Sequence, residues 1–249
     1  MPFNINMIPH TVFIIPYRNR AKHKETMDRY LKQVFESKKW TNASVDIIYC
    51  HQQDTRPFNR GATKNIGFLY IKNKYPDDYK NITFIFHDID TYASNPSILP
   101  YKTNNNIVSH YYGFRFCLGG IFCIKGCDFE RTGGFPNLWG WGFEDNIINT
   151  RCLENNIIID RSNFYNICDK SIIRVFDGYL RKMSKRELTD RDNKRETDTF
   201  SDIENIEMTR NNEMLDISYF TTKHEYFEDE FCNYDIRNGT KLGKQINDL

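Results

Sequence analysis

Short apolar runs alternate with amphipathic stretches over the first third of the chain. Residues 11–16 (TVFIIP) and 44–50 (SVDIIYC) are apolar runs of strand length, and 82–90 (ITFIFHDID) is apolar before it turns acidic. Between these runs, residues 21–37 and 61–75 place apolar side chains at helical spacing. The order strand, helix, strand, helix, strand predicts an α/β fold with a mixed, mostly parallel central sheet flanked by helices.

The pattern is less regular further along the chain. Residues 106–110 (NIVSH) and 118–124 (LGGIFCI) predict two more strands, and NIINTRCLENN (146–156) predicts a helix. The charged segment 176–198 predicts a solvated helix or a mobile loop, with a lid over a site as the alternative. Residues 201–249 are expected to add strands or a helix to the same body.

Composition narrows the class of protein. The 249 residues are 39% hydrophobic, which is enough for a substantial core, and 34 basic residues nearly balance 33 acidic ones. The formal charge of +1 argues against a nucleic acid or an anionic membrane held by bulk electrostatics. No apolar run reaches the roughly 20 residues of a membrane span, and the N-terminus lacks the basic region of a signal peptide. With seven cysteines and no secretory signal, we expect a soluble, cytoplasmic protein with reduced thiols.

Each of the first three predicted strands ends in polar side chains. Arg18 and Arg20 follow the first strand, Arg56 and Arg60 follow the second, and the third ends in HDID. Ligands of parallel sheets bind at the carboxyl ends of the strands, so these groups are expected to converge on one site. Guanidinium groups hold phosphates in a bidentate manner, which favours an anionic ligand.

Asp88 and Asp90 are the two acids of that third ending. Side chains two residues apart on a strand share a face, so both carboxylates are expected to point the same way. Two close carboxylates repel each other unless a cation lies between them, and oxygen ligands of this kind suit Mn²⁺ or Mg²⁺ together with substrate phosphates. Two solvated acids in a turn are the alternative interpretation.

Residues 133–147 (GGFPNLWGWGFEDNI) combine two tryptophans, four glycines and a pair of acids. The flat indole faces of Trp139 and Trp141 suit the C–H faces of a sugar ring. Glu144 and Asp145 can accept hydrogen bonds from sugar hydroxyls, and an acid beside a bound sugar can act as a general base. The alternative is a tryptophan pair that fills the core beside a helix whose first turn carries acids favoured by the helix dipole.

In order and spacing, four stretches resemble the β-1,4-galactosyltransferase family, glycosyltransferase family 7. They are IPYRNR (15–20), FNRGATKNIGF (58–68), FHDID (86–90) and GGIFCIKGCDFERTGGFPNLWGWGFEDNI (119–147). The resemblance implies a GT-A type nucleotide-sugar-binding fold. It also implies inverting, metal-dependent transfer of galactose or an N-acetylhexosamine from a UDP-sugar to a hydroxyl of a glycan or glycoconjugate.

The same resemblance implies roles for individual residues. The donor-binding positions are Pro16, Arg18, Arg20, Phe58, Arg60, Asp88, Cys117 and Gly120. The acceptor-binding positions are Trp141, Phe143 and Glu144, with Asp145 as the general base. Asp90 is the expected ligand of Mn²⁺ or Mg²⁺.

Several positions depart from the family pattern. Asn146 replaces a third acid, and Phe143 replaces a glycine or arginine. Val175 stands where the family has a metal-ligating histidine, which leaves Asp177 as a candidate oxygen ligand. Cys117 replaces a tyrosine that restricts the donor pocket to galactose, so we expect altered donor use that includes N-acetylhexosamines.

We expect one catalytic domain over residues 1–249, with a nucleotide-binding part at about 11–130, an acceptor and catalytic part at about 131–200 and a C-terminal extension at about 201–249. The motifs begin close to Met1, so no membrane anchor is expected, as would suit a viral or microbial glycosylation system. One alternative is a catalytically silent UDP-sugar- or glycan-binding module. Another is a metal-dependent phosphohydrolase, which would need more acids or histidines near the Asp88–Asp90 pair.

Overall fold

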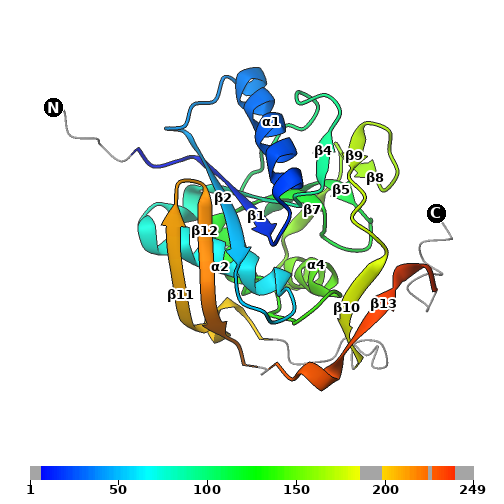
Figure 1. Ribbon diagram of the computed structural model, residues 1–249. Helices are drawn as coiled ribbons and strands as arrows, with labels where there is room; N and C mark the ends of the chain where they lie inside the picture. The colour runs from blue at the N-terminus through cyan, green and yellow to red at the C-terminus, as the bar shows by residue number, and fades with distance from the viewer. Residues whose placement is uncertain (1–6, 186–197, 224–225, 239–249) are drawn as a thin grey trace.

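The computed structural model describes residues 7–185, 198–223 and 226–238 (Figure 1). Its centre is a sheet that begins with β1 (Thr11–Tyr17), whose seven residues are all buried. β1 lies between β2 (Val45–Gln52) and β3 (Thr83–His87) and runs parallel to both. Across the described residues, nine strands join this sheet in the order β11-β12-β2-β1-β3-β6-β5-β7, and β8 pairs with β5.

The outer strands extend the sheet on both sides of this parallel centre. β6 (Ile121–Lys125) is antiparallel to β3 and to β5 (Ile107–Gly113), while β7 (Ile158–Asp160) and β8 (Tyr165–Asn166) run parallel to β5. On the other side, β12 (Met214–Thr221) is parallel to β2, and β11 (Glu204–Asn211) closes that edge in a hairpin. The C-terminal region therefore adds strands to the same body, as predicted.

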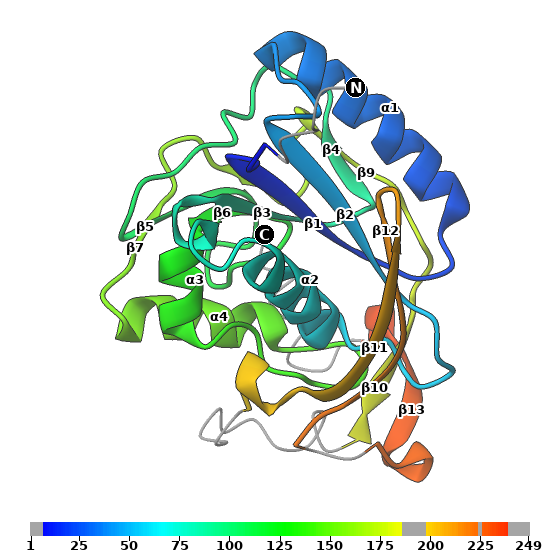
Figure 2. The same cartoon turned by 90° about the vertical axis from the view of Figure 1, so that its left-hand side faces the viewer.

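Helices cover both faces of the sheet (Figure 2). α1 (Ala21–Lys38) lies on one face, and α2 (Arg60–Lys74), α3 (Gly126–Thr132) and α4 (Glu144–Glu154) lie on the other. Two buried apolar clusters, one on each face, hold these layers together. The predicted mixed, mostly parallel sheet with flanking helices is confirmed.

The third strand is shorter than predicted. β3 ends at His87, where its pairing with Ile121 of β6 stops, so Asp88 and Asp90 lie in the turn before β4 (Thr91–Ala93). Gly120 precedes β6 with a φ of +71°, and its carbonyl accepts the Asp88 N–H at 3.0 Å. This backbone turn ends the ladder, so the strand-alternation argument for the two acids was wrong.

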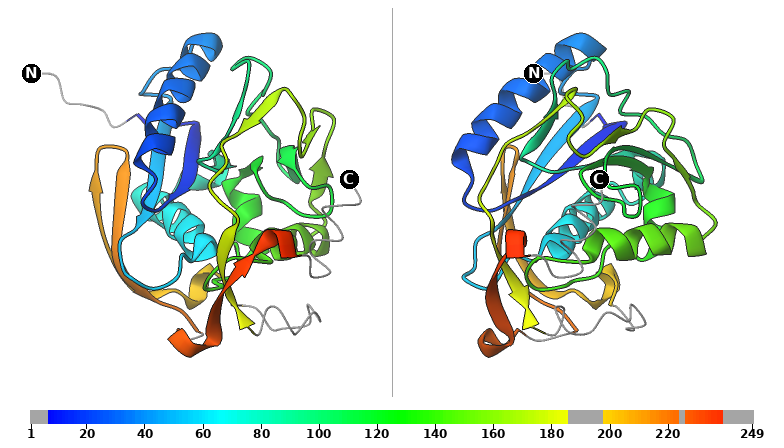
Figure 3. Two further views of the ribbon diagram at one scale, coloured as in Figure 1. Left: turned by 45° about the vertical axis from the view of Figure 1, so that its right-hand side comes forward. Right: turned by 90° about the vertical axis from the view of Figure 1, so that its right-hand side faces the viewer.

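The charged segment also differs from its prediction. β10 (Leu180–Ser184) pairs antiparallel with β13 (Phe231–Asp235), where a solvated helix or loop was expected. Figure 3 shows this ribbon apart from the main sheet, near the start of α4. β9 (Ile172–Arg174) pairs with β4 in a second small ladder. Residues 186–197 of this segment, for which a lid was the alternative interpretation, lie outside the described residues.

In the described part of the chain, no helix has both the length and the apolar character needed to cross a bilayer.

Candidate active site

Two adjoining pockets open at the carboxyl ends of β1, β2 and β3. We call the first, of about 260 Å³, the basic pocket, and the second, of about 160 Å³, the aromatic pocket. The basic pocket is lined by Pro16, Arg18, Arg20, Phe58, Arg60, Asp88, Ile89, Asp90, Gly140, Trp141, Arg174, Asp177, Leu180, Arg181 and Lys182. The aromatic pocket is lined by Arg60, Phe114, Phe116, Cys117, Trp141, Gly142, Phe143, Glu144, Asp145, Asn146, Arg174, Arg181 and Ile236. The two pockets share a wall formed by Arg60, Trp141, Arg174 and Arg181.

Arg60 is the central member of that wall. Its Nη2 lies 2.6 Å from Asp88 Oδ1 in the basic pocket, and its Nη1 lies 3.4 Å from Glu144 Oε1 in the aromatic pocket. Arg60 is the first residue of α2, whose N-terminus is capped by the Asn59 side chain accepting the Ala62 N–H. One guanidinium thus neutralises an acid on each side of the boundary.

Asp88 and Asp90 have different electrostatic surroundings. Burial disfavours the charged form of Asp88, but the Arg60 guanidinium and the Lys64 ammonium outweigh it and hold the pKa of this carboxyl below its usual value. Burial and the neighbouring Asp88 charge raise the pKa of Asp90, and its ion pair with Arg20 is longer, at 3.7 Å. Asp90 is therefore a buried carboxylate that an additional cation would stabilise.

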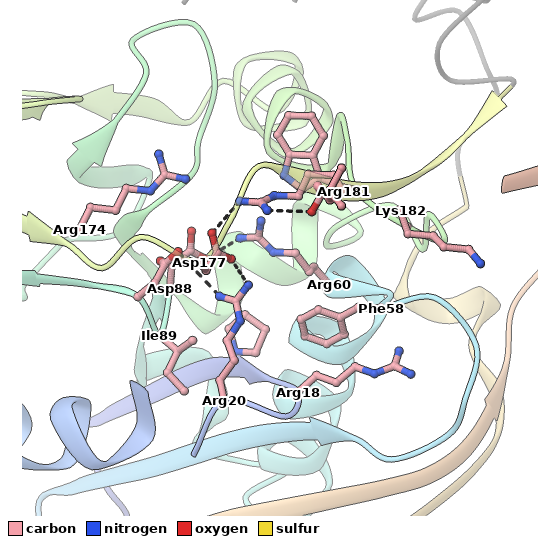
Figure 4. A pocket seen from close by; sticks show the side chains of 15 residues that line it. Arg18, Arg20, Phe58, Arg60, Asp88, Ile89, Arg174, Asp177, Arg181 and Lys182 are labelled. Atoms are coloured by element: carbon pink, nitrogen blue, oxygen red, sulfur yellow. Dashed lines mark hydrogen bonds and ion pairs between the residues drawn. The ribbon is translucent and has the colours of Figure 1, made fainter. Parts of the chain in front are cut away.

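Asp177, the candidate replacement ligand, is held by two arginines. Arg20 forms an ion pair with it, and Arg181 Nη2 lies 2.7 Å from its Oδ1 (Figure 4). The backbone N–H of Val175 donates to the Asp90 carbonyl at 2.7 Å, so this position does lie beside the acid pair. Within residues 7–185, 198–223 and 226–238, no group of three or more His, Cys, Asp or Glu side chains is placed to hold a metal ion.

The two arginines that follow β2, Arg56 and Arg60, lie in different surroundings. Arg60 lines both pockets, whereas Arg56 lies outside them: its guanidinium stacks 4.4 Å from the Trp139 ring and pairs with Asp54. Arg18 lines the basic pocket and donates to the Asp54 carbonyl at 2.8 Å. The prediction of convergent arginines holds for Arg18, Arg20 and Arg60 but not for Arg56.

The two tryptophans also lie in different surroundings, one in the core and one at the pockets. Trp139 is 7% exposed and stacks on Phe220 with ring centroids 5.2 Å apart, so it fills the core. Trp141 lines both pockets, and its backbone N–H donates to the Lys182 carbonyl of β10 at 2.8 Å. Trp139 fills the core, as in the alternative interpretation, whereas Trp141 lies at the two pockets.

The acid pair of the same motif begins α4. Phe143 precedes the helix with a φ of +59°, a left-handed conformation that turns the chain into Glu144 and Asp145. The Asp145 carbonyl accepts the Leu118 N–H at 2.8 Å, and a side chain at Gly119 would overlap the Asp145 carboxylate. Glycine at position 119 therefore makes room for this acid against the sheet.

Burial raises the pKa of Asp145 to about 6. The Lys64 ammonium, 3.4 Å from Asp145 Oδ1, opposes this rise, while the neighbouring Glu144 charge adds to it and Arg60 lowers it. A carboxylate with a raised pKa is a better proton acceptor near neutral pH.

Of two further residues predicted to bind the donor, Cys117 lines a pocket and Gly120 does not. Cys117 lines the aromatic pocket and is buried; burial, with the nearby Asp145 charge, raises the pKa of its thiol to about 12. Gly120 lines neither pocket, and it acts through its carbonyl, which orients the Asp88 backbone.

Sequence reasoning missed several lining residues: Phe114, Phe116, Arg174, Arg181, Lys182 and Ile236. The aromatic pair in GFRFC, just before Cys117, was a readable clue, since Phe114 and Phe116 stack at 5.1 Å. Arg181 and Lys182 were hidden because their charged segment looked solvated. Ile236 belongs to no motif.

Comparison with known proteins identifies the family. A model of the N-terminal region of glycosyl transferase group 7 matches residues 1–102, and a model of the N-terminal domain of galactosyltransferase matches residues 101–173. Together the two matches span more than half of the chain. The chain belongs to glycosyltransferase family 7.

Curated relatives and a solved structure agree with this family. Human β-1,4-galactosyltransferase 2 is 32% identical over 158 residues, covering 59% of this chain and 41% of that protein. Cricetulus griseus β-1,4-galactosyltransferase 4 is 27% identical over 173 residues, covering 65% and 48%. The chain spans about half the length, or less, of these relatives.

A Drosophila β-1,4-galactosyltransferase 7 mutant, solved in complex with manganese, UDP-Gal and xylobiose, superposes with a TM-score of 0.64. It is 15% identical, with 88% of this chain and 96% of that chain covered. This similarity confirms the GT-A type fold.

Proposed function

We propose that the chain is an inverting, metal-dependent glycosyltransferase that moves galactose or an N-acetylhexosamine from a UDP-sugar to a glycan hydroxyl. The observation that carries this proposal is the junction of the two pockets. Arginines and the Asp88–Asp90 pair face one side, Glu144 and Asp145 face the other, and Arg60 touches acids on both. The β-1,4-galactosyltransferase relatives support the same reaction.

The basic pocket suits the nucleotide diphosphate. Six of its lining side chains are basic and three are acidic, so an anionic ligand would balance its charge. Planar guanidinium groups form charge-assisted hydrogen bonds with phosphate oxygens, and they would stabilise the negative charge that develops on departing UDP. Pro16 and Phe58 supply the apolar wall of the same pocket.

The residues present fit a divalent cation that would be bound partly by the protein and partly by the donor. Asp90 would hold Mn²⁺, or Mg²⁺, together with phosphate oxygens, as is usual for metal ions bound with phosphates. Asp177 would join only after giving up an arginine partner. When bound, the cation supplies positive charge at the diphosphate. The neighbouring Drosophila structure contains manganese with UDP-Gal.

Asp145 is the proposed general base on the aromatic side. It would take the proton of the acceptor hydroxyl as that oxygen attacks the anomeric carbon. The bond from that carbon to UDP breaks on the opposite face, which inverts the configuration. Glu144 would accept hydrogen bonds from other acceptor hydroxyls, and Trp141, at the boundary, would cover both sugars. Phe143 forms part of the acceptor wall.

The donor sugar is proposed to be less restricted than in the family pattern. Cys117 is a small, neutral side chain in the aromatic pocket, so more space remains there than a tyrosine would leave. UDP-GalNAc and UDP-GlcNAc would then compete with UDP-Gal.

A UDP-release assay with these three donors and a glycan acceptor panel tests the proposal. Turnover that requires Mn²⁺ or Mg²⁺, stops with EDTA and is lost in Asp90→Ala would support it. The arginine partners of Asp177 and the valine at position 175 motivate a second candidate, a catalytically silent UDP-sugar-binding module. Saturable UDP binding without turnover on any donor would favour that module and contradict the enzyme.

A further inference from the structure

Lys64 is a buried lysine that none of the sequence motifs singled out. It lies in α2 and is 2% exposed, and its Nζ is 3.4 Å from Asp145 Oδ1 and 4.4 Å from the centre of the Phe135 ring. An ammonium group is costly to bury unless an opposite charge accompanies it. The Asp145 carboxylate is that partner.

The local structure holds Lys64 in place. The neighbouring Asn65 donates to the Phe135 carbonyl at 2.8 Å and accepts the Phe135 N–H at 2.9 Å. The backbone at Gly61 packs so closely against Pro136 that a side chain at position 61 would overlap it. These contacts fix α2 against the segment that leads into the tryptophan motif and α4.

Lys64 approaches Asp145 from inside the protein. Asp145 lines the aromatic pocket, whereas Lys64 lines neither the basic nor the aromatic pocket, so Lys64 would act on Asp145 without touching substrate. A group with this placement is a positioning residue.

The other charged and titratable groups around Asp145 make this contact important. Glu144 on α4 and Asp88 after β3 both repel its negative charge, and the buried Cys117 thiol is neutral. Arg60 attracts the charge, but its guanidinium already pairs with Asp88 and Glu144. Among the residues that the structure describes, Lys64 is the cation in direct contact with the carboxylate.

We propose that Lys64 orients the Asp145 carboxylate and keeps it ionised, so that Asp145 accepts the acceptor proton at neutral pH. This inference rests on the proposed role of Asp145 as base. It gives the buried ammonium group of Lys64 a role. The direction of the effect is fixed by charge: burial already raises the pKa of Asp145 to about 6 with Lys64 present, and removal of the ammonium would raise that pKa further.

The first test measures the Asp145 titration directly and needs no activity. Protein labelled with ¹³C at the aspartate carboxyls is titrated by NMR, and Asp145→Asn assigns the signal. We expect Lys64→Met to raise the Asp145 pKa by about one unit or more, as loss of a close opposite charge does. Lys64→Arg should restore most of the wild-type value.

Lys72→Met is the matched control. Lys72 lies on the same helix and pairs with Glu130 at 2.7 Å, away from Asp145. Its replacement should leave the Asp145 titration unchanged. If Lys64→Met binds UDP as the wild type does and still shows the wild-type Asp145 titration, the inference is overturned.

The second test is the pH dependence of transfer. A base is active when deprotonated, so kcat falls as the pH drops through the pKa of Asp145. In Lys64→Met this acid limb should move to higher pH by the same shift, with the donor KM little changed. An unshifted limb would contradict the inference, whereas an inactive wild type with a shifted NMR titration would contradict only the proposed reaction.

Folding of the variants is checked by UDP binding and thermal unfolding. If Lys64→Met does not fold, the expected cause is the loss of the ion pair, which leaves the partly buried Asp145 carboxylate without its cation. The double variant Lys64→Met/Asp145→Asn removes both charges and should then recover folding. If the double variant unfolds as readily as the single one, the proposed ion pair between Lys64 and Asp145 would be contradicted.

Discussion

The basic and aromatic pockets share a wall but recognise different chemistry. In the basic pocket, charge dominates: three aspartates are paired with arginines, and basic side chains remain in excess. In the aromatic pocket, Phe114, Phe116, Trp141 and Phe143 surround two acids at the start of a helix. The first suits a ligand defined by its phosphates, and the second suits a ligand defined by its shape and hydroxyls. The reaction proposed above requires both kinds of recognition side by side.

The largest effect is expected at Arg60, which joins the two pockets. Arg60→Met leaves the partly buried Asp88 and the buried Glu144 without their common cation, and loss of a charge partner in such a place costs up to about 3–5 kcal/mol. We expect reduced stability in chemical denaturation, weaker UDP binding by calorimetry and loss of transfer. Arg56→Met is the matched control, because Arg56 follows the same strand but lies outside both pockets. Equal losses of UDP affinity in the two variants would show that Arg60 has no special place at the boundary.

The two tryptophan variants should each affect one property, folding stability for Trp139 and transfer for Trp141, whereas the Arg60 variant affects both. Trp139→Ala removes a buried ring stacked on Phe220 and should lower the free energy of unfolding by about 3–5 kcal/mol. Trp141→Ala should change unfolding less but reduce kcat/KM for transfer, because this ring lines both pockets. Unfolding curves and steady-state kinetics on both proteins check this. A Trp141 variant that is unstable but fully active when folded would refute the division.

A change of donor preference is expected at Cys117. Cys117→Tyr fills part of the aromatic pocket and should favour UDP-Gal over UDP-GalNAc by about tenfold, the usual scale for discrimination by pocket size. Competition between the two donors gives the ratio directly. Cys123→Ser is a suitable control, since Cys123 is buried in β6 outside both pockets. If the ratio of UDP-Gal to UDP-GalNAc use is unchanged in Cys117→Tyr, position 117 does not contact the donor sugar.

The smallest effect is expected at Asp177. Its carboxylate holds Arg20 and Arg181, so Asp177→Asn should loosen the basic pocket and weaken UDP binding only a few-fold, roughly 1 kcal/mol. The affinity of the UDP complex for Mn²⁺, measured by calorimetry, should change little in Asp177→Asn, in contrast to Asp90→Ala. A loss of Mn²⁺ affinity as large in Asp177→Asn as in Asp90→Ala would make Asp177 a ligand rather than an arginine partner.

The regular part of the fold could be predicted from the sequence because its patterns are local. The strand at 11–16 and the helix at 21–37 agree with β1 and α1 to within one residue. The end of β3 could not be predicted, since it depends on a turn at Gly120, which lies more than thirty residues later. β10 was missed because its partner, β13, is distant in the sequence. In addition, the charged residues of β10 resemble those of a solvent-exposed segment.

The site shows the same limit. Arg18, Arg20, Asp88 and Asp90 were found because each follows a strand, and the topology brings strand ends together. Trp139 and Trp141 carry the same residue type two positions apart, and only packing against Phe220 separates their roles. Lys64 was missed because a lysine inside an amphipathic helix is normally exposed, and its burial is a tertiary property.

The central claim is that Asp145 accepts the acceptor proton while the diphosphate of the donor is held in the basic pocket, and one comparison tests it most directly. Transfer and UDP binding are measured across pH 5–9 for the wild type and for Asp145→Asn. We predict that wild-type kcat falls as the pH drops through about 6, where the Asp145 carboxylate gains its proton. Asp145→Asn should lose transfer by about 10²–10⁴-fold at every pH while binding UDP normally. An Asp145→Asn protein that still transfers sugar at the wild-type rate would contradict the account.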